Sequence, residues 1–193
     1  WEAGVVGAGG AGFPTWKKVD ARVETVIVNG AECEPLLRND QQLMARSPDE
    51  IVKGLRLVME ATGARKGIIA LKKKYREATE ALRGELTSGD NIRIHLLESV
   101  YPAGDEFVIV YETTGKVIPG GQIPLQVGVL VSNVETFYNI SRAREKTPVT
   151  HRNLTVTGAV RKPVTLRLPV GTPLAAAVKL AGGAVIPDWT VVC

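Results

Sequence analysis

The chain has 193 residues, of which 45% are hydrophobic and 23% charged, and its formal net charge is +4. This length and composition suit a globular protein with one medium domain, or one domain and a small appendage. No apolar run approaches the roughly 18 residues that cross a membrane, so we do not expect a membrane-spanning protein.

Charge and cysteine content narrow the class further. Only 5% of the residues are aromatic, and no basic stripe alternates with stacking side chains as in nucleic-acid-binding proteins. The basic run Lys72–Lys74 is therefore predicted to be a solvated face or a site for an anionic cofactor. Two cysteines, Cys33 and Cys193, are too few for a disulfide framework or for an iron–sulfur cluster with four thiolates. We expect a protein of the reducing cytoplasm that does not bind nucleic acid.

The first motif is a glycine-rich run, Gly7–Gly12, with Lys17 and Lys18 close behind it. Glycines allow positive φ angles, and successive amides of such a run form a concave donor surface that a phosphate can fill. The lysines would supply the countercharge, whereas a mobile glycine-rich linker is the alternative interpretation. The run fits the Gly-x-Gly-x-x-Gly pattern, but no strand precedes it in the sequence. It therefore predicts phosphate binding without indicating which phosphate.

Strand and helix patterns alternate after this run. The expected strands cover residues 25–28, 67–71, 91–96 and 127–131, and the expected helices cover residues 48–62, 75–86, 105–112 and 133–144. Ser47 and Glu50 predict a capping box at the first of these helices, which Gly63 closes. Either Ser132 or Asn133 can cap the last one. The alternation predicts an α/β fold layered around a parallel sheet.

The composition changes near residues 146–148, and we place a domain boundary between residues 1–147 and 148–193. Strands are expected at 154–158 and 164–168, a helix at 173–181 and one more strand at the C-terminal end. This order is that of a small β-grasp unit. Residues 1–4 look like the tail of a truncated helix and residues 190–193 like an interrupted strand, so we expect a piece of a longer protein.

Polar residues follow the first expected strand, at Asn29, Glu32 and Glu34. Ligands of open α/β sheets bind at this carboxyl end of the strands. The two carboxylates could accept hydrogen bonds from a polar ring or a ribose, or they could form a solvated turn. Cys33 between them is expected to be a small packed residue.

A second polar segment, Gly104–Glu106, precedes an expected helix, and a third begins at Ser132. Acidic residues in a first helical turn are also favoured by the helix dipole alone, and Asn133 could be a plain helix cap. Residues 113–126 form a long expected loop of the kind that is often functional. No spacing of His, Asp and Glu suggests a metal site, and no nucleophile elbow is present.

Four segments occur in an order that resembles the flavoprotein subunit of respiratory complex I and its relatives: Gly7–Lys18, Asn29–Asp40, Tyr101–Glu106 and Ser132–Thr136. The variant Gly-Ala-Glu-Cys-Glu-Pro at residues 30–35 is similar to the branch of RnfC, a subunit of a ferredoxin:NAD⁺ oxidoreductase, and PduS, a cobalamin reductase. Residues after about 150 resemble the SLBB domain. The resemblance implies a Rossmann-like layered FMN-binding domain followed by a small β-grasp (SLBB) domain.

The resemblance also implies a set of cofactor-binding residues. They are Gly7, Gly9, Gly10, Lys18, Asn29, Glu32, Gly104, Glu106, Ser132 and Asn133. The first three glycines would hold the FMN phosphate, with Lys18 as its counterion. Asn29 and Glu32 would lie along the flavin, and Ser132 and Asn133 near its ribityl or phosphate end.

NADH is the implied substrate, and it would meet Phe13, Glu34 and Glu106, with Gly104 and Glu106 bordering the flavin where nicotinamide docks. Electrons would leave the flavin singly toward an iron–sulfur centre or a corrin. The cofactor performs the redox chemistry, so no side chain is predicted to be catalytic and none to bind a metal. Four-iron clusters of the relatives are expected only downstream of these residues.

Two departures from the family pattern leave a second hypothesis open. Ala8 stands in place of an arginine, and Ala31 in place of an aspartate. A scaffold or binding module that keeps the fold and has lost the cofactor would fit these changes. Under the first hypothesis the partners are NADH and other electron-transfer subunits or a cobalamin or iron–sulfur acceptor. We then expect a cytoplasmic protein, or one at the cytoplasmic face of a membrane complex without insertion into the membrane.

Overall fold

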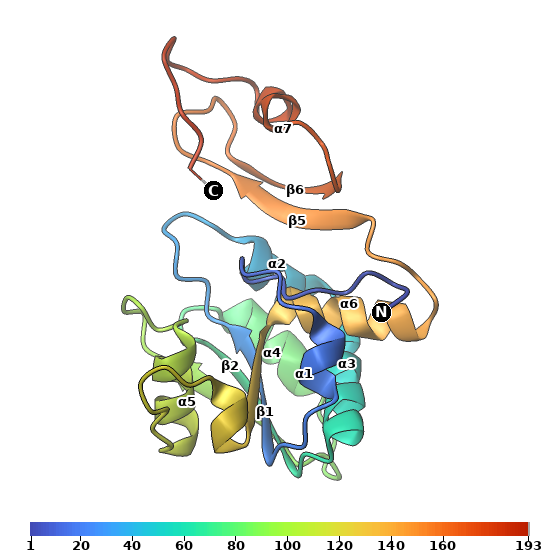
Figure 1. Cartoon of the computed structure of the whole chain (residues 1–193). Helices are drawn as coiled ribbons and strands as arrows, with labels where there is room; N and C mark the ends of the chain where they lie inside the picture. The colour runs from blue at the N-terminus through green and yellow to red at the C-terminus, as the bar shows by residue number, and fades with distance from the viewer. Residues whose placement is uncertain (193) are drawn as a thin grey trace. The chain divides into compact units, whose positions relative to one another are not determined.

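The computed structural model describes residues 1–192, which form two compact units (Figure 1). The first unit contains residues 1–33 and 40–149. The second contains residues 34–39 and the chain from Thr150 onward. The short segment 34–39 thus belongs with the later part of the chain although it follows the first strand directly.

The first unit is built on a parallel sheet. Its strands are β1 (Thr25–Gly30), β2 (Lys66–Lys72), β3 (Ile92–Leu97) and β4 (Val129–Asn133). Their order across the sheet is β3-β2-β1-β4, and every neighbouring pair is parallel. The α/β fold with a parallel sheet is therefore confirmed. The chain extends the sheet outward from β1 to β3 and then returns to place β4 on the free side of β1.

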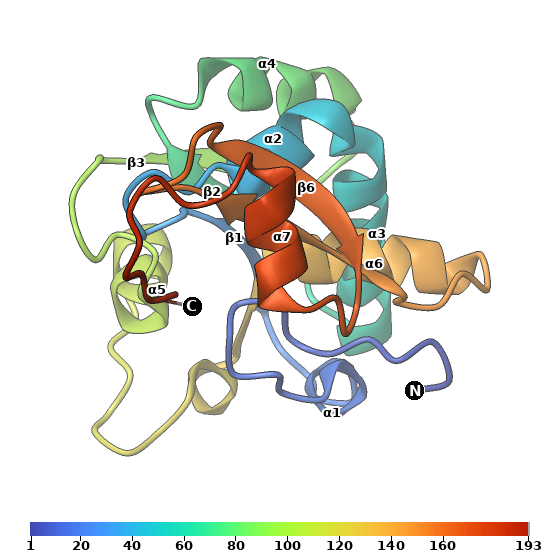
Figure 2. The same ribbon diagram turned by 90° about the horizontal axis from the view of Figure 1, so that it is seen from above.

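Helices cover both faces of this sheet. They are α1 (Thr15–Val19), α2 (Asn39–Arg46), α3 (Pro48–Thr62), α4 (Arg76–Glu85), α5 (Glu106–Thr114) and α6 (Val134–Arg144), with a 3₁₀ helix η1 (Pro124–Val127). Figures 1 and 2 show α5 on one side of the sheet and α3 and α6 on the other. Alternate residues of β1 supply the two cores: Val26 and Val28 pack in the core of α3, α4 and α6, and Ile27 packs with α5. This alternation follows from the period of two in a strand.

Close packing of α3 on α6 depends on a glycine inside α3. A Cβ atom built on Gly54 would lie 2.0 Å from the backbone oxygen of Phe137, whose side chain is fully buried. Such an approach is far below any normal contact distance. Gly54 therefore allows the two helix backbones to approach each other directly.

Several local expectations were wrong. The Ser47 side chain makes no capping hydrogen bond. Glu50 instead accepts a hydrogen bond from the Ser141 hydroxyl, and its Oε1 lies 3.4 Å from Nη1 of Arg142. The expected loop 113–126 is shorter, because α5 continues to Thr114 and η1 begins before its end. Residues 1–4 form a turn rather than the tail of a helix. None of the helices within residues 1–192 has the length and apolar character needed to span a membrane.

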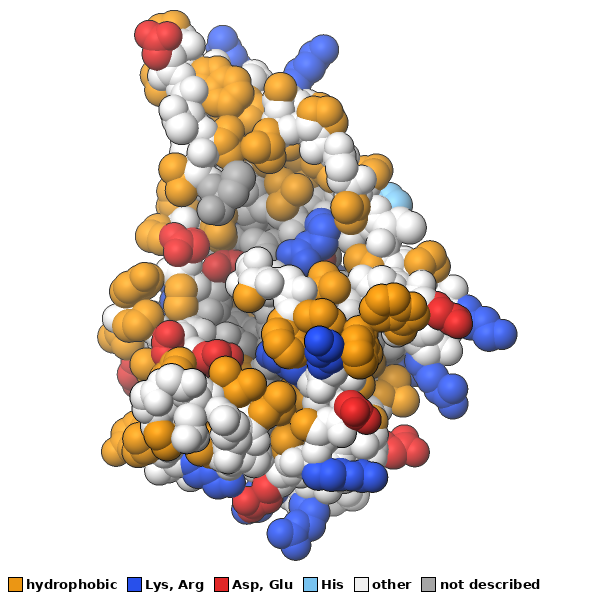
Figure 3. Space-filling model, viewed as in Figure 1, with side chains coloured by type: hydrophobic (Ala, Val, Ile, Leu, Met, Phe, Trp, Pro, Cys, Tyr) orange, Lys and Arg blue, Asp and Glu red, His pale blue; other side chains and the backbone are white. Residues whose placement is uncertain are grey.

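The second unit contains the antiparallel strands β5 (His151–Val156) and β6 (Val164–Pro169) and the helix α7 (Leu174–Leu180). The expected hairpin and helix are present. The expected further strand is absent from residues 184–192, where a single bridge joins Val160 and Ala184. Cys193, the end of that expected strand, lies outside the described residues. Hydrophobic side chains gather on the face of this unit seen in Figure 3.

The packing of α3 and α6 predicts opposite effects for two glycine substitutions. Gly54→Ala should lower the free energy of unfolding by about 1–3 kcal/mol, since the new methyl group overpacks the helix contact. Gly84→Ala in α4 is the control, because a Cβ there meets nothing within 4 Å. It should raise the free energy of unfolding by about 0.5–1 kcal/mol through helix propensity. Urea unfolding measures both, and a neutral Gly54→Ala would contradict the close approach.

Candidate functional site

The order of the strands creates one special point at the carboxyl edge of the sheet. Strands β2 and β4 lie on either side of β1. The connection after β1 leads to β2, whereas the connection after β3 returns across the sheet to β4. In open α/β sheets, ligands bind in the crevice that such a reversal opens beyond the strand ends. Asn29 of β1 pairs in register with Asn133 of β4. These two residues therefore mark the switch point.

The glycine-rich run lies over the junction of β4 and α6. The backbone N–H of Ala8 donates to the Thr136 hydroxyl at 3.0 Å, and a Cβ atom on Gly9 would lie 3.5 Å from the Cβ of Asn133. The N–H of Gly7 donates to the oxygen of Phe13 at 2.8 Å and closes the loop. The run is thus a loop held by hydrogen bonds at the switch point, which favours a binding loop over a free linker.

Between these anchors the chain turns tightly at the surface. Residues 8–11 form a hydrogen-bonded turn, and residues 9–12 are all exposed. Gly10 and Gly12 have φ angles of 112° and 61°, which only glycine adopts without strain. Successive amides turned in this way form a nest for an anion, and the nearby N-terminus of α6 adds a favourable dipole.

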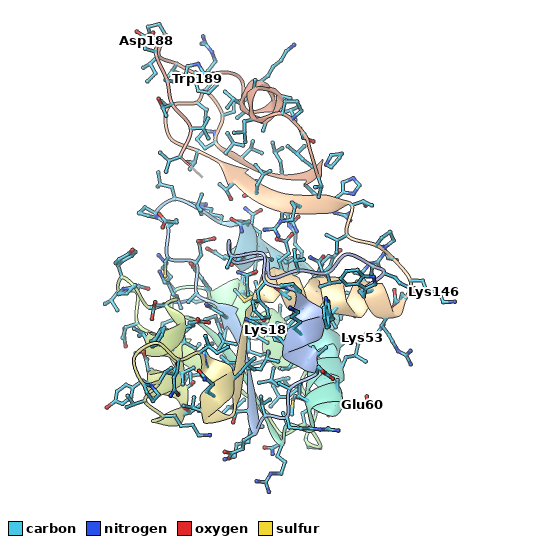
Figure 4. All side chains as sticks on the ribbon, viewed as in Figure 1. Lys18, Lys53, Glu60, Lys146, Asp188 and Trp189 are labelled. Carbon is cyan, nitrogen blue, oxygen red and sulfur yellow. The ribbon has the colours of Figure 1, made fainter. Side chains whose placement is uncertain are left out.

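Lys18 is the cation of this region. Its Nζ donates to the oxygen of Val131 at 2.8 Å and lies 5.6 Å from the centre of the Phe13 ring. Burial lowers the pKa of Lys18, and the negative charge of Glu106 partly opposes this shift. Lys17 is exposed and lies over the ring of Trp16 instead. Figure 4 shows Lys18 on the side of α1 that faces the sheet.

A clasp fastens the loop before α5 to the end of β1. Asn29 donates from Nδ2 to the oxygen of Gly104 at 2.8 Å, and the N–H of Gly104 donates to Sγ of Cys33 at 2.9 Å. A Cβ atom on Gly104 would lie 2.2 Å from the oxygen of Ala31, so the clasp requires glycine. Cys33 is half-buried, and because its Sγ accepts the hydrogen bond from Gly104, the residue does more than fill space. Its role was missed because the contact spans 71 residues of sequence.

The clasp fixes the start of α5. Asp105 caps this helix by accepting hydrogen bonds from the N–H groups of Phe107 and Val108 at 2.9 and 3.2 Å. Glu106 follows in the first turn and is half-buried, close enough for its charge to act on Lys18. The clasp thus holds Glu106 near the cation of the site.

Asn133 has a structural role. Its Oδ1 accepts from the N–H of Glu135 at 2.8 Å and caps α6, while its Nδ2 donates to Asp40 at 2.7 Å. The predicted cap is therefore Asn133, and its carboxamide is engaged at both ends. Ser132 beside it is buried. A ligand contact by Ser132 or Asn133 stays a prediction.

A buried tyrosine was missed by the sequence reasoning. Tyr75 is 4% exposed, and burial together with the negative charges of Glu32 and Asp40 raises its pKa to about 12. Glu32 and Asp40 therefore face the same region as the phenol. No simple signal marks Tyr75 in the sequence, because it follows a run of lysines.

The predicted residues are brought together in the first unit, with one exception. Glu34 belongs to the second unit and is exposed. Within residues 1–192, no cluster of His, Cys, Asp and Glu could hold a metal ion. A parallel sheet whose switch point carries a glycine-rich loop, a lysine and an amide side chain has the arrangement at which open α/β domains bind phosphate-bearing ligands.

Comparison with known proteins identifies the family. The chain belongs to the family of the Nuo51 FMN-binding domain, which matches residues 1–142, and an SLBB domain matches residues 153–190. It is 53% identical to the cobalamin reductase PduS of Citrobacter freundii over 96% of this chain and 41% of that protein. It is 36% identical to one subunit of the Na⁺-translocating ferredoxin:NAD⁺ oxidoreductase complex of Acetobacterium woodii, over 94% of this chain and 42% of that protein. The chain thus spans about two fifths of these relatives.

A solved structure supports the same assignment. The chain superposes on an NAD⁺-reducing [NiFe]-hydrogenase in the air-oxidized state with a TM-score of 0.79 and 25% identity. The match covers 95% of this chain and 37% of that one. The family, the layered fold and the presence of the SLBB domain are therefore confirmed, and the relatives are electron-transfer oxidoreductases or parts of them.

The clasp predicts that Gly104 cannot be replaced. Gly104→Ala should displace the loop, raise amide exchange in residues 101–105 and lower the free energy of unfolding by about 1–3 kcal/mol through overpacking. Gly120→Ala is the matched control, because a Cβ there meets nothing within 4 Å. Unchanged exchange in Gly104→Ala would refute the clasp.

The raised pKa of Tyr75 predicts a loss of stability at high pH. The folded state holds the neutral phenol, so its contribution is complete below pH 10 and is lost as the pH rises toward 12. The free energy of unfolding of the wild type should therefore fall more steeply over this range than that of Tyr75→Phe. Parallel curves in urea unfolding would show that Tyr75 is not held neutral.

Proposed function

We propose that this chain binds FMN at the crevice between β1 and β4 and passes electrons from NADH through the flavin to a one-electron acceptor. The observation that carries the proposal is the exposed glycine turn at residues 9–12, with positive φ angles at Gly10 and Gly12, together with the half-buried Lys18 beside it. Membership of an FMN-binding family supports it. When bound, FMN would accept electrons in pairs and release them singly.

The phosphate end of FMN fits the loop. Amides of the loop would donate to the phosphate oxygens, and Lys18 would supply the countercharge across the crevice. Ala8, which stands where relatives have an arginine, uses its backbone N–H to hold the loop on Thr136. The loop is therefore held in position without the arginine side chain.

The ring end would be oriented by the end of β1. Asn29 holds the backbone of Gly104, and Glu32 provides an acceptor near Tyr75. The clasp requires glycine at position 104, because a side chain there would collide with the backbone of Ala31 just after β1. We assign these residues to positioning of the flavin, with no proton transfer by any of them.

NADH would approach from the side of Phe13 and Glu106. The Phe13 side chain is 39% exposed and can stack on a planar ring, and Glu106 can accept hydrogen bonds from an amide or ribose. The similar hydrogenase is NAD⁺-reducing, which supports a nicotinamide partner. We assign Glu34 as a further NADH contact from the resemblance alone.

A corrin or an iron–sulfur centre would receive the electrons. The identity to the cobalamin reductase exceeds that to the ferredoxin:NAD⁺ oxidoreductase component, 53% against 36%, which favours the corrin. The second relative belongs to a complex of several proteins, which supports other electron-transfer subunits as partners. The rival hypothesis, a scaffold without cofactor, is motivated by Ala31 in place of an acidic residue.

Lys18 provides the first test. Lys18→Ala should weaken FMN binding by about 1.5–3 kcal/mol, the range of a hydrogen bond to a charged group. Lys17→Ala, the exposed neighbour, should leave the affinity unchanged. Titration of FMN by its fluorescence measures both, and equal affinities would remove Lys18 from the site.

Anaerobic reduction tests the donor. The full-length protein reconstituted with FMN should lose the visible absorption of oxidised flavin when NADH is added. A folded protein that takes up no FMN would favour the scaffold hypothesis. A protein that binds FMN but shows no bleaching with NADH would keep the cofactor and overturn the donor.

A further inference from the structure

The basic run at the end of β2 divides into one buried and two exposed lysines. Lys72 is 6% exposed, whereas Lys73 and Lys74 are open to solvent. Lys73 pairs with Glu98, and Lys74 lies 5.7 Å from the centre of the Tyr75 ring. Within residues 1–192, the Lys72 ammonium makes no hydrogen bond or ion pair. Lys72 is thus a covered cation that the described chain does not neutralise.

Its position places it at the carboxyl edge. Leu71 pairs in register with Gly30, the last residue of β1, and Lys72 extends one residue further, opposite Leu97 of β3. Side chains of a strand alternate between faces, so Lys72 shares the face of Ile68 and Ala70, which is the face covered by α5. Lys72 therefore stands level with Ala31, where β1 leads into the clasp.

The ammonium group of Lys72 is not completely shielded from solvent. Within the described chain, the hydroxyl of Thr15 is the single completely buried side-chain polar atom that lacks a partner, so Nζ of Lys72 retains some solvent contact. Leu97 and Ala31 beside it are buried and apolar. A covered charge without a partner is unfavourable unless an anionic group meets it. The arrangement therefore calls for a negative group of a ligand at this edge.

The phosphate proposed above cannot be this group. The glycine-rich loop lies at β4 and α6, and β2 is two strands away from β4, a distance of about 10 Å. A cofactor anchored by its phosphate at the loop and extending across the end of β1 would turn its ring end toward β2. The ring is thus the part of FMN that Lys72 can meet.

We propose that Lys72 binds the pyrimidine edge of the flavin and favours its reduced form; this inference rests on the proposed function. Transfer of a hydride breaks a C–H bond of the reduced nicotinamide, forms an N–H bond on the flavin and adds one negative charge to the ring system. The nicotinamide leaves as a cation. A positive charge beside the ring stabilises that added charge, and it acts more strongly in a covered site than in water.

The test compares Lys72→Met with Lys74→Met in the full-length protein. Methionine keeps the length and apolar stem of lysine and removes the charge. We expect Lys72→Met to bind oxidised FMN about as well as the wild type and reduced FMN about tenfold more weakly. A tenfold change corresponds to a midpoint potential lower by about 30 mV for a two-electron couple. Lys72→Arg should retain the wild-type potential, and Lys74→Met should leave it unchanged.

Measuring stability distinguishes a role of Lys72 in binding the flavin from a purely structural role. Because Lys72 has no partner within the described chain, Lys72→Met without cofactor should be as stable as the wild type or more stable. A large loss of stability, or an unchanged ratio of affinities for oxidised and reduced FMN, would overturn the inference and leave the proposed function intact. If the wild type binds FMN in neither state, the proposed function and the inference both fail.

Discussion

The parallel pairing of β4 with β1, on the side of β1 opposite to β2, is the constraint on which the rest depends. It sets Asn29 beside Asn133 and places the topological switch point of the sheet between β1 and β4. The glycine-rich loop can then lie on the start of α6, and Lys18 can reach the end of β4. Without this reversal of strand order, these groups would belong to separate surfaces.

Positive and negative groups occupy different parts of this site. The glycine turn at residues 9–12 and Lys18 form a positive region at β4, whereas Glu32 and Asp40 form a negative region near Tyr75. Lys72 adds a second positive charge at β2. A cofactor with a charged phosphate and a ring that gains charge on reduction matches such a division. Backbone contacts such as the Gly104 clasp hold these groups in place, so that a bound ligand would meet a preorganised site.

Sequence patterns predicted the four strands of the parallel sheet and the helices α3 to α6, because a β-branched run such as Thr25–Val28 is typical of a strand covered on both faces. The short helices α1 and α2 were not predicted. Capping was less predictable. Ser47 lost its capping box because Glu50 is engaged by Ser141, a contact across 91 residues. The burial of Lys72 likewise depends on the register of β2. The family was recognised from ordered motifs and is confirmed, while the individual FMN and NADH contacts stay predictions.

The proposed site depends on the loop at residues 9–12 holding a phosphate whose cofactor continues over the end of β1. The affinities of the full-length protein for FMN and for riboflavin, which has the same ring and lacks the phosphate, test this most directly. Riboflavin should bind at least about tenfold more weakly than FMN, because it lacks one or more charged hydrogen bonds to the loop. Equal affinities for the two flavins would contradict it.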